Sequence, residues 1–338
     1  MGHLRPLLLL ALAVVPAAQA SAQSPPPAAP AKAKIALDLQ KVGFVDRAVA
    51  FTGKAFRVRG TVTPFVAGQR VRLRAYRGKQ LVSAKIKPIV ASETGQVGLF
   101  RAEFKTKFPG NLRVGVTHVR TAEMAFAHAR TDKVAVIGTS SEPGRTGHTV
   151  KVMQGLLREA GYVTGRYGVY DDRTARAVHA FRKMSGLART FTASRVVLRR
   201  LLNGGGRFQV RFPQHGHHVE ADLTHQVLAL IDDGKVERLY PMSSGAPSTP
   251  TILGSYRVYL KGAGTNAKGM VHSSFFIRGY AIHGYASVPP YPASHGCLRV
   301  PVPDAWSIFS WVRHGDYVDT YYRSGTHRSG KPGASVGP

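Results

Sequence analysis

The spacing of apolar residues changes twice along this 338-residue chain, and each change restricts what the segment can fold into. From about residue 35 to 140, apolar and polar residues alternate, as where Val71, Leu73 and Ala75 are separated by Arg72 and Arg74. An apolar residue at every second position, interrupted by glycine-containing turns, predicts antiparallel strands with one buried and one solvent-facing side. We therefore expect a β-sandwich over residues 35–140.

The apolar interval lengthens to three and four residues between positions 145 and 204, after a turn-rich stretch at 140–144. Such spacing places an apolar stripe along one side of a helix. Three sets of this kind begin at Val152, Ala175 and Val197, and Asp172 and Ser194 are the expected N-caps of the second and third helices. We expect a small three-helix domain at 145–204, with a flexible glycine-rich joint at 203–206.

Short strand patterns return after this joint and predict a mainly-β domain over residues 207–323. The clearest local signal is Asp233-Gly234 between two apolar runs, which is typical of a two-residue hairpin turn. A short helix is expected at 305–312 and a last strand at 317–321. In this interpretation His283 ends a strand and Cys297 closes a proline-rich loop, so the fold can bring the two together.

Residues 1–22 have the composition of a secretory signal peptide, with Arg5 before an apolar run from Leu7 to Val15 and small residues around Ala20. The apolar run is too short to cross a bilayer core of about 30 Å. We expect cleavage here, a linker rich in proline and alanine at 23–34, and a secreted protein of the cell wall or periplasm with no stable membrane span. Residues 324–338 are expected to be a disordered tail.

Cys297 is the only cysteine, so no disulfide can form within the chain and packed cores must stabilise it. It lies in Ser294-His295-Gly296-Cys297-Leu298-Arg299, ten residues after the pair His283-Gly284. A neighbouring imidazole can take the proton of a thiol and leave a nucleophilic thiolate. Gly296 lets the backbone turn tightly, so that amide groups can point at the oxygen of an attacked carbonyl. The set predicts cysteine-dependent acyl transfer.

Two other interpretations of Cys297 are an inert buried thiol and a zinc site. Zinc needs four ligands, and the nearby histidines form no known ligand spacing such as C-x-x-C or H-E-x-x-H. A second histidine group has no companion cysteine or spaced carboxylate, and we expect it to form surface hydrogen bonds. Its members are His215, His217, His218 and His225. No metal is expected.

Three motifs together resemble the L,D-transpeptidase (YkuD-type) catalytic domain, over roughly residues 207–323. They are Ile282-His283-Gly284, the stretch 294–299, and Thr249-Pro250-Thr251-Ile252-Leu253-Gly254. The resemblance implies a cysteine acyltransferase that cross-links bacterial peptidoglycan through its stem peptides. It implies no metal or organic cofactor.

By this resemblance, Cys297 attacks a donor stem tetrapeptide, expels the terminal D-alanine and retains the acyl group as a thioester. His283 is the implied general base, and the Gly284 carbonyl would fix its tautomer as a carboxylate does in other triads. His295 is only two residues from the thiol, so the sequence leaves open which histidine is the base and which supports the oxyanion. Further oxyanion and substrate contacts are implied for Ser294, Gly296 and Arg299.

The same site would be an L,D-carboxypeptidase if water replaced the acceptor amine. A different class also remains open, a wall-binding protein whose catalytic fold is inactive. The helical segment supports wall binding, because its series Gly161-Tyr162, Gly168, Asp171 and Phe181 resembles a small peptidoglycan-binding domain. The expected sandwich resembles the immunoglobulin-like modules of surface proteins, which implies spacing or wall contact.

The chain is strongly basic, with 47 lysines and arginines against 18 acidic residues and a formal charge of +29. Such a charge would fit nucleic acid, but an exported protein does not meet it, and no recognition motif is present. The cations are spread along the chain instead of forming one arm. Anionic wall polymers or anionic lipid surfaces are therefore the expected counterparts, attracted by long-range electrostatics.

Overall fold

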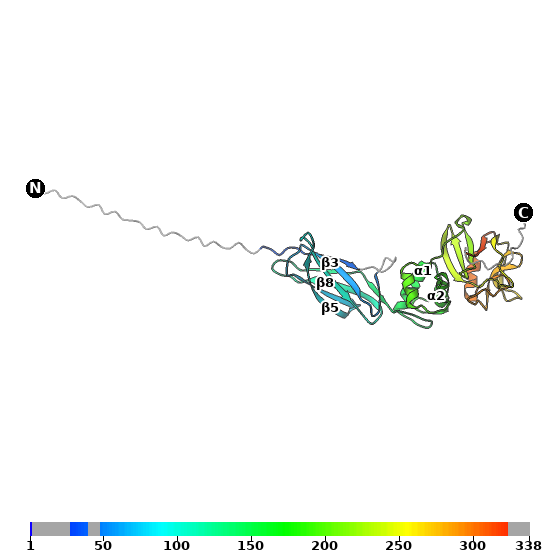
Figure 1. The fold of residues 1–338 in the computed structure, drawn as a ribbon, viewed down its shortest axis with the longest axis horizontal. Coiled ribbons are helices and arrows are strands. Elements are labelled where there is room, and N and C mark those ends of the chain that lie inside the picture. The colour runs from blue at the N-terminus through cyan, green and yellow to red at the C-terminus, as the bar shows by residue number, and fades with distance from the viewer. Residues whose placement is uncertain (2–27, 40–47, 324–338) are drawn as a thin grey trace.

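The computed structural model describes Met1 and residues 28–39 and 48–323. Three parts follow one another along its long axis: N-terminal β-sheets, a helical segment and C-terminal β-sheets (Figure 1). The expected signal peptide beyond Met1, the first part of the linker and the tail at 324–338 lie outside the described residues. Within the described part, no helix is long and apolar enough to cross a membrane.

Two sheets form the N-terminal part and enclose one apolar core. The first has the order β1 (Lys34–Leu39), β3 (Phe56–Thr63), β7 (Gly98–Phe104) and β6 (Val90–Ala91). The second has the order β2 (Ala48–Phe51), β10 (Val134–Ile137), β8 (Gly110–His118), β4 (Arg70–Arg77) and β5 (Gln80–Pro88), and β9 (Ala127–Arg130) pairs with β8. Val71, Leu73 and Ala75 are buried while Arg72 and Arg74 are exposed, as the alternation predicts.

The helical segment consists of α1 (His148–Glu159), α2 (Asp172–Met184) and α3 (Arg195–Leu202). The three expected helices are therefore present, but one cap differs. Asp171 and not Asp172 is the N-cap of α2, because its carboxylate accepts the backbone N–H of Thr174. Ser194 is the N-cap residue of α3, although its side chain makes no capping hydrogen bond.

The C-terminal part has two sheets. The first has the order β13 (Lys235–Pro241), β12 (Val227–Asp232), β11 (His218–Asp222), β19 (Tyr317–Tyr321) and β14 (Gly254–Arg257), and a 3-10 turn, η1 (Pro213–His215), precedes β11. The second has the order β15 (Leu260–Thr265), β16 (Val271–Ile277), β17 (Tyr280–Tyr285) and β18 (Leu298–Pro301), and α4 (Val302–Trp311) follows it. Asp233 and Gly234 have φ values of 45° and 74°, so the expected hairpin turn is present between β12 and β13.

The helices and the C-terminal sheets share one apolar core, which the sequence does not predict. Leu157 and Phe181 from the helices belong to the same buried cluster as Ala229 and Leu239 from β12 and β13. The glycine-rich stretch expected to be a flexible joint is packed: a side chain on Gly206 would overlap the Phe181 ring, and the Tyr162 hydroxyl donates to the Gly206 carbonyl. The helical segment is thus part of the same packed body as the C-terminal sheets.

Candidate active site

Parallel pairing of β17 with β18 brings together the two chain segments that carry the expected nucleophile and base. His283 lies opposite Arg299, and Ile282 lies opposite Leu298. Paired residues share a face and side chains alternate along each strand, so His283 and Arg299 lie on one face, and Cys297 directly precedes β18. The other face carries Ile282 and Leu298 into the apolar core. The sequence does not predict β18, and His283 lies within β17, not at its end.

His283 is buried and its ring orientation is fixed by its own chain. The Gly284 carbonyl oxygen lies 2.9 Å from Nδ1. Because a carbonyl can only accept, Nδ1 carries the proton and Nε2 is left with a lone pair. Burial lowers the pKa of His283; the bond to Gly284 opposes this and the charge of Arg299 adds to it. The resting imidazole is therefore neutral and able to accept a proton.

The Cys297 thiol is half-buried, and its sulfur lies 3.7 Å from the Gly279 carbonyl oxygen. Burial raises the pKa of this thiol, against the backbone of Ala281 and the charges of Arg299 and Lys268. The sequence-based expectation was a thiolate produced by the neighbouring imidazole. Burial shifts both pKa values toward the neutral forms instead, because desolvation disfavours the charged form of each group.

Ser294 and Gly296 shape the loop that carries the thiol. The Ser294 hydroxyl donates to the Cys297 carbonyl at 2.6 Å, and the Gly296 amide donates to the Ser294 hydroxyl at 3.0 Å. Gly296 has φ of 108°, and a Cβ there would lie 1.9 Å from Tyr280 Cε1. In this conformation the Gly296 amide is engaged by Ser294 and not directed at a substrate oxygen, which differs from the oxyanion role expected from sequence.

Two threonines of the upstream motif hold the same loop from the other side. Thr249 Oγ1 donates to the Ser294 carbonyl at 2.8 Å, and Thr251 Oγ1 donates to the Gly296 carbonyl at 2.8 Å. Sequence reasoning assigned these threonines no role, although the Thr249-Pro250-Thr251 motif was itself noticed. The signal that could have indicated their role is a short hydroxyl side chain on either side of a proline, because such side chains readily hydrogen-bond to nearby backbone carbonyls.

The remaining site residues lie at different depths. His295 is exposed, unlike His283. The Arg299 guanidinium lies 4.2 Å from the centre of the Tyr285 ring, and that ring meets His283 edge-on with centroids 5.7 Å apart. Arg299 is therefore held over an aromatic side chain beside the buried histidine.

Comparison with known proteins shows the family to which the chain belongs. A sequence profile of the L,D-transpeptidase catalytic domain matches residues 216–320. The crystal structure of an L,D-transpeptidase from Xylanimonas cellulosilytica is 33% identical, with a TM-score of 0.50, and the match covers 54% of this chain and 98% of that one. The chain belongs to the L,D-transpeptidase family.

Other L,D-transpeptidases are more distant. The structure from Stackebrandtia nassauensis is 22% identical with a TM-score of 0.36, covering 57% of this chain and 100% of that one. The structure from Mycobacterium smegmatis is 12% identical with a TM-score of 0.29, covering 85% and 99%. No curated protein sequence matches the chain.

The second histidine group of this L,D-transpeptidase chain pairs with carboxylates. His215, His217, His218 and His225 contact Asp319, Asp316, Glu220 and Asp222 respectively. His218 is fully buried, which differs from the surface placement expected from sequence. Across the described residues, no cluster of three or more histidine, cysteine or acidic side chains could hold a metal ion.

Proposed function

We propose that the chain is a cell-wall L,D-transpeptidase that forms peptidoglycan cross-links through a thioester on Cys297. Family membership supports this, as does the strand pairing that puts His283 opposite Arg299, two residues after Cys297. The donor is a tetrapeptide stem, attacked at the carbonyl of the L-centre of its diamino acid. The acceptor is an amine of a neighbouring stem.

Protons balance if His283 serves both half-reactions. Cys297 sulfur bonds to the donor carbonyl carbon while its proton passes to His283 Nε2, and the proton then leaves with the amine of D-alanine as the C–N bond breaks. The acceptor amine next attacks the thioester and gives a proton to Nε2, which returns it to the departing sulfur. Because burial disfavours the charged forms of both the thiol and the imidazole, the first transfer is proposed to accompany attack.

Support for the oxyanion is proposed to come from the Cys297 amide and His295, since the Gly296 amide is engaged by Ser294. Arg299 is proposed to order the site or hold a substrate carboxylate. Ser294 would act by shaping the loop.

Intact-protein mass spectrometry with a tetrapeptide stem tests this function. We expect an acyl adduct on the protein and free D-alanine. Adding a stem amine should yield a cross-linked product, whereas release of tripeptide into water identifies the L,D-carboxypeptidase alternative. A folded chain that forms no adduct would be the inactive wall-binding protein, and the proposal would be wrong.

The pH dependence of acylation should show the buried histidine. His283 must be neutral to accept a proton, and burial lowers its pKa below the ordinary histidine value. The rate should therefore fall on acidification only below the pH at which a free histidine protonates. Rapid-quench acylation rates measured from about pH 4 to about pH 8, the range in which histidine side chains titrate, follow this acidic fall in rate. A limb above the ordinary histidine value would contradict a desolvated base.

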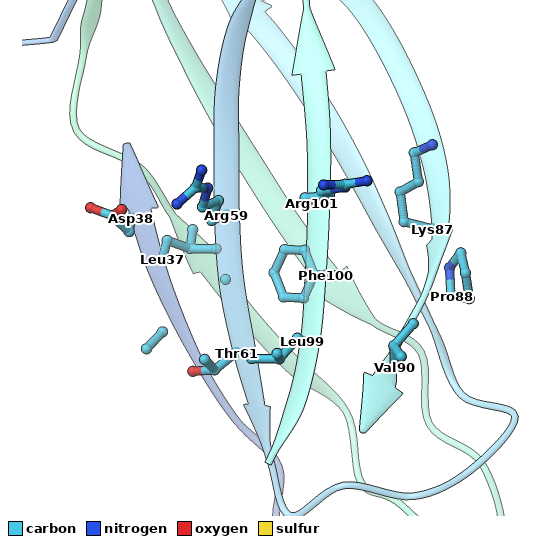
Figure 2. Close-up of a pocket in the computed structure, with 12 residues that line it drawn as sticks. Leu37, Asp38, Arg59, Thr61, Lys87, Pro88, Val90, Leu99, Phe100 and Arg101 are labelled. Carbon is cyan, nitrogen blue, oxygen red and sulfur yellow. The ribbon is translucent and has the colours of Figure 1, made fainter. Parts of the chain in front are cut away.

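Wall contact is proposed for the N-terminal sheets. An open groove of about 690 Å³ lies over the outer face of β1, β3 and β7. Asp38, Arg59 and Arg101 occupy neighbouring positions across the three strands, and Lys87 extends this row on β5 (Figure 2). Like charges directly opposite each other destabilise a sheet. The row thus holds three cations against one carboxylate.

The neighbouring row of charged residues contains one cation paired with one carboxylate. Arg57 lies opposite Glu103 and donates to its carboxylate at 2.7 Å. Arg59 faces Arg101 instead, so the unbalanced charge favours an anionic partner. We commit to an anionic wall polymer, which an exported chain of this family would meet. The immunoglobulin-like character of the sheets and the peptidoglycan-binding character of the helices remain proposals of the same kind, resting on sequence resemblance.

Neutralising the groove should weaken wall binding. The double variant Arg59→Gln and Arg101→Gln should lose affinity for purified wall at low salt, by about fivefold per cation. Arg72→Gln with Arg74→Gln, on exposed positions of β4, removes the same charge elsewhere and is the matched control. Cosedimentation measures both. Equal losses in the two double variants would show that net charge alone, and not this groove, attracts the wall.

A further inference from the structure

Helix α2 reaches the backbone of the catalytic domain through a buried lysine. Lys183 is 3% exposed, and its ammonium donates to the carbonyls of Gln226 and Met242 at 3.1 and 3.2 Å. Among the ion pairs of the described residues, none includes Lys183. Burial and the nearby Arg189 lower the pKa of Lys183 to about 7. A buried amine with no carboxylate partner is costly to charge and must still have its N–H groups hydrogen-bonded, so apolar packing alone does not explain it.

The hydrogen bonds continue from there to the loop of the thiol. Gln226 Nε2 donates to the Ser244 hydroxyl at 2.8 Å, and Gln226 Oε1 accepts the Ser244 amide at 2.9 Å. The Ser244 carbonyl accepts the amides of Ala293 and Ser294 at 2.8 and 2.9 Å. Ser294 in turn bonds to the Cys297 carbonyl. We call Lys183, Gln226, Ser244 and Ser294 the buried chain, since each is at most 3% exposed.

We propose that Lys183 is a positioning residue for Cys297 and acts through the buried chain. The helical segment then belongs to the catalytic unit: it lies against β13 and fixes the backbone on which the thiol is carried (Figure 1). The proposal rests on the proposed function in that Cys297 is taken as the nucleophile. Small displacements of a reacting group slow acyl transfer strongly, so a contact four links away can still affect turnover.

Another contact between the same two parts supplies a matched control. Arg173 and Arg176 of α2 pair with Asp304 of α4, at 2.9 and 3.1 Å. This contact holds the helices to the C-terminal sheets but does not touch the buried chain. Replacing Arg176 therefore weakens docking while Arg173 retains its pair, and the path to the thiol stays intact.

The test compares Lys183→Met, Ser244→Ala and Arg176→Met in the full chain with a tetrapeptide stem. We expect Lys183→Met to lower kcat for acylation by about tenfold or more while KM changes little. Arg176→Met should acylate at the wild-type rate even where its thermal midpoint falls. Ser244→Ala, a small change that keeps the backbone, should lower kcat in the same way. An unchanged kcat in folded Lys183→Met would overturn the proposal, as would unchanged kcat in Ser244→Ala should Lys183→Met not fold.

Combining the variants tests whether one path is involved. If Lys183 acts through Ser244, the double variant is no slower than the slower single one, whereas Arg176→Met and Ser244→Ala combine additively. A double variant whose loss of kcat equals the product of the losses in Lys183→Met and Ser244→Ala would contradict a shared path.

Alkylation of the thiol by iodoacetamide needs no acyl transfer and separates this inference from the proposed function. A looser loop would expose more of the half-buried Cys297 thiol. The alkylation rate of Lys183→Met and of Ser244→Ala at about pH 8 should therefore be several-fold higher than that of the wild type. Arg176→Met should match wild type. A wild-type chain that forms no acyl-enzyme refutes the function alone, and equal alkylation rates in all variants refute the positioning role alone.

Discussion

Cys297→Ala is expected to form no acyl-enzyme at all. The sulfur is the atom that bonds to the donor carbonyl, and no other cysteine exists to replace it. The variant should fold, because a small side chain replaces another and no disulfide is lost. Ser294 would still bond to the backbone carbonyl of residue 297, so the loop keeps its shape.

Intact-protein mass spectrometry and circular dichroism on the same sample check both halves of this result. Wild-type protein should gain the mass of the tripeptide acyl group, and the alanine variant should remain at its own mass with an unchanged spectrum. An adduct on the folded alanine variant would show that another side chain is the nucleophile. Loss of the spectrum would show that the thiol has a packing role.

His283→Ala is expected to slow acylation by about 10² to 10⁴, the usual contribution of a positioned general base. Its Nδ1 donates to the Gly284 carbonyl, so Nε2 keeps the lone pair that can accept a proton. His295→Ala should have a smaller effect, because His295 is exposed and is proposed only to support the oxyanion. Single-turnover acylation rates of the two variants rank the histidines.

Thiol alkylation against pH provides the control for this comparison. Burial raises the pKa of Cys297, so wild-type alkylation should rise only above the pH at which an ordinary thiol ionises. Because His283 is neutral at rest, His283→Ala should change acylation far more than it changes this profile. If His295→Ala causes the larger loss of acylation, or wild-type Cys297 alkylates as a thiolate near pH 7, the assignment of base and neutral pair is wrong.

Much of the fold could be predicted because its signals are local. Alternation at Val71, Leu73 and Ala75 indicates a strand wherever that strand pairs, and Asp233-Gly234 requires a turn from its own backbone preferences. The family could be predicted for a similar reason, because the identifying motif Ser294-His295-Gly296-Cys297 is contiguous in the sequence. These features depend on residues that are neighbours in sequence.

What only the tertiary structure decided depends on residues far apart in the chain. The pairing of β17 with β18 places His283 opposite Arg299, two residues from Cys297, and no local pattern marks which strands will meet. Helix α2 packs against β12 and β13 in a shared apolar core, where a flexible joint at 203–206 was expected, and this packing buries Lys183. The directions in which the pKa values of the thiol and imidazole shift also depend on the tertiary structure, since a pKa depends on how much water the whole fold excludes. Sequence therefore determined most of the elements and the family, and long-range packing determined which segments meet and how far water is excluded from them.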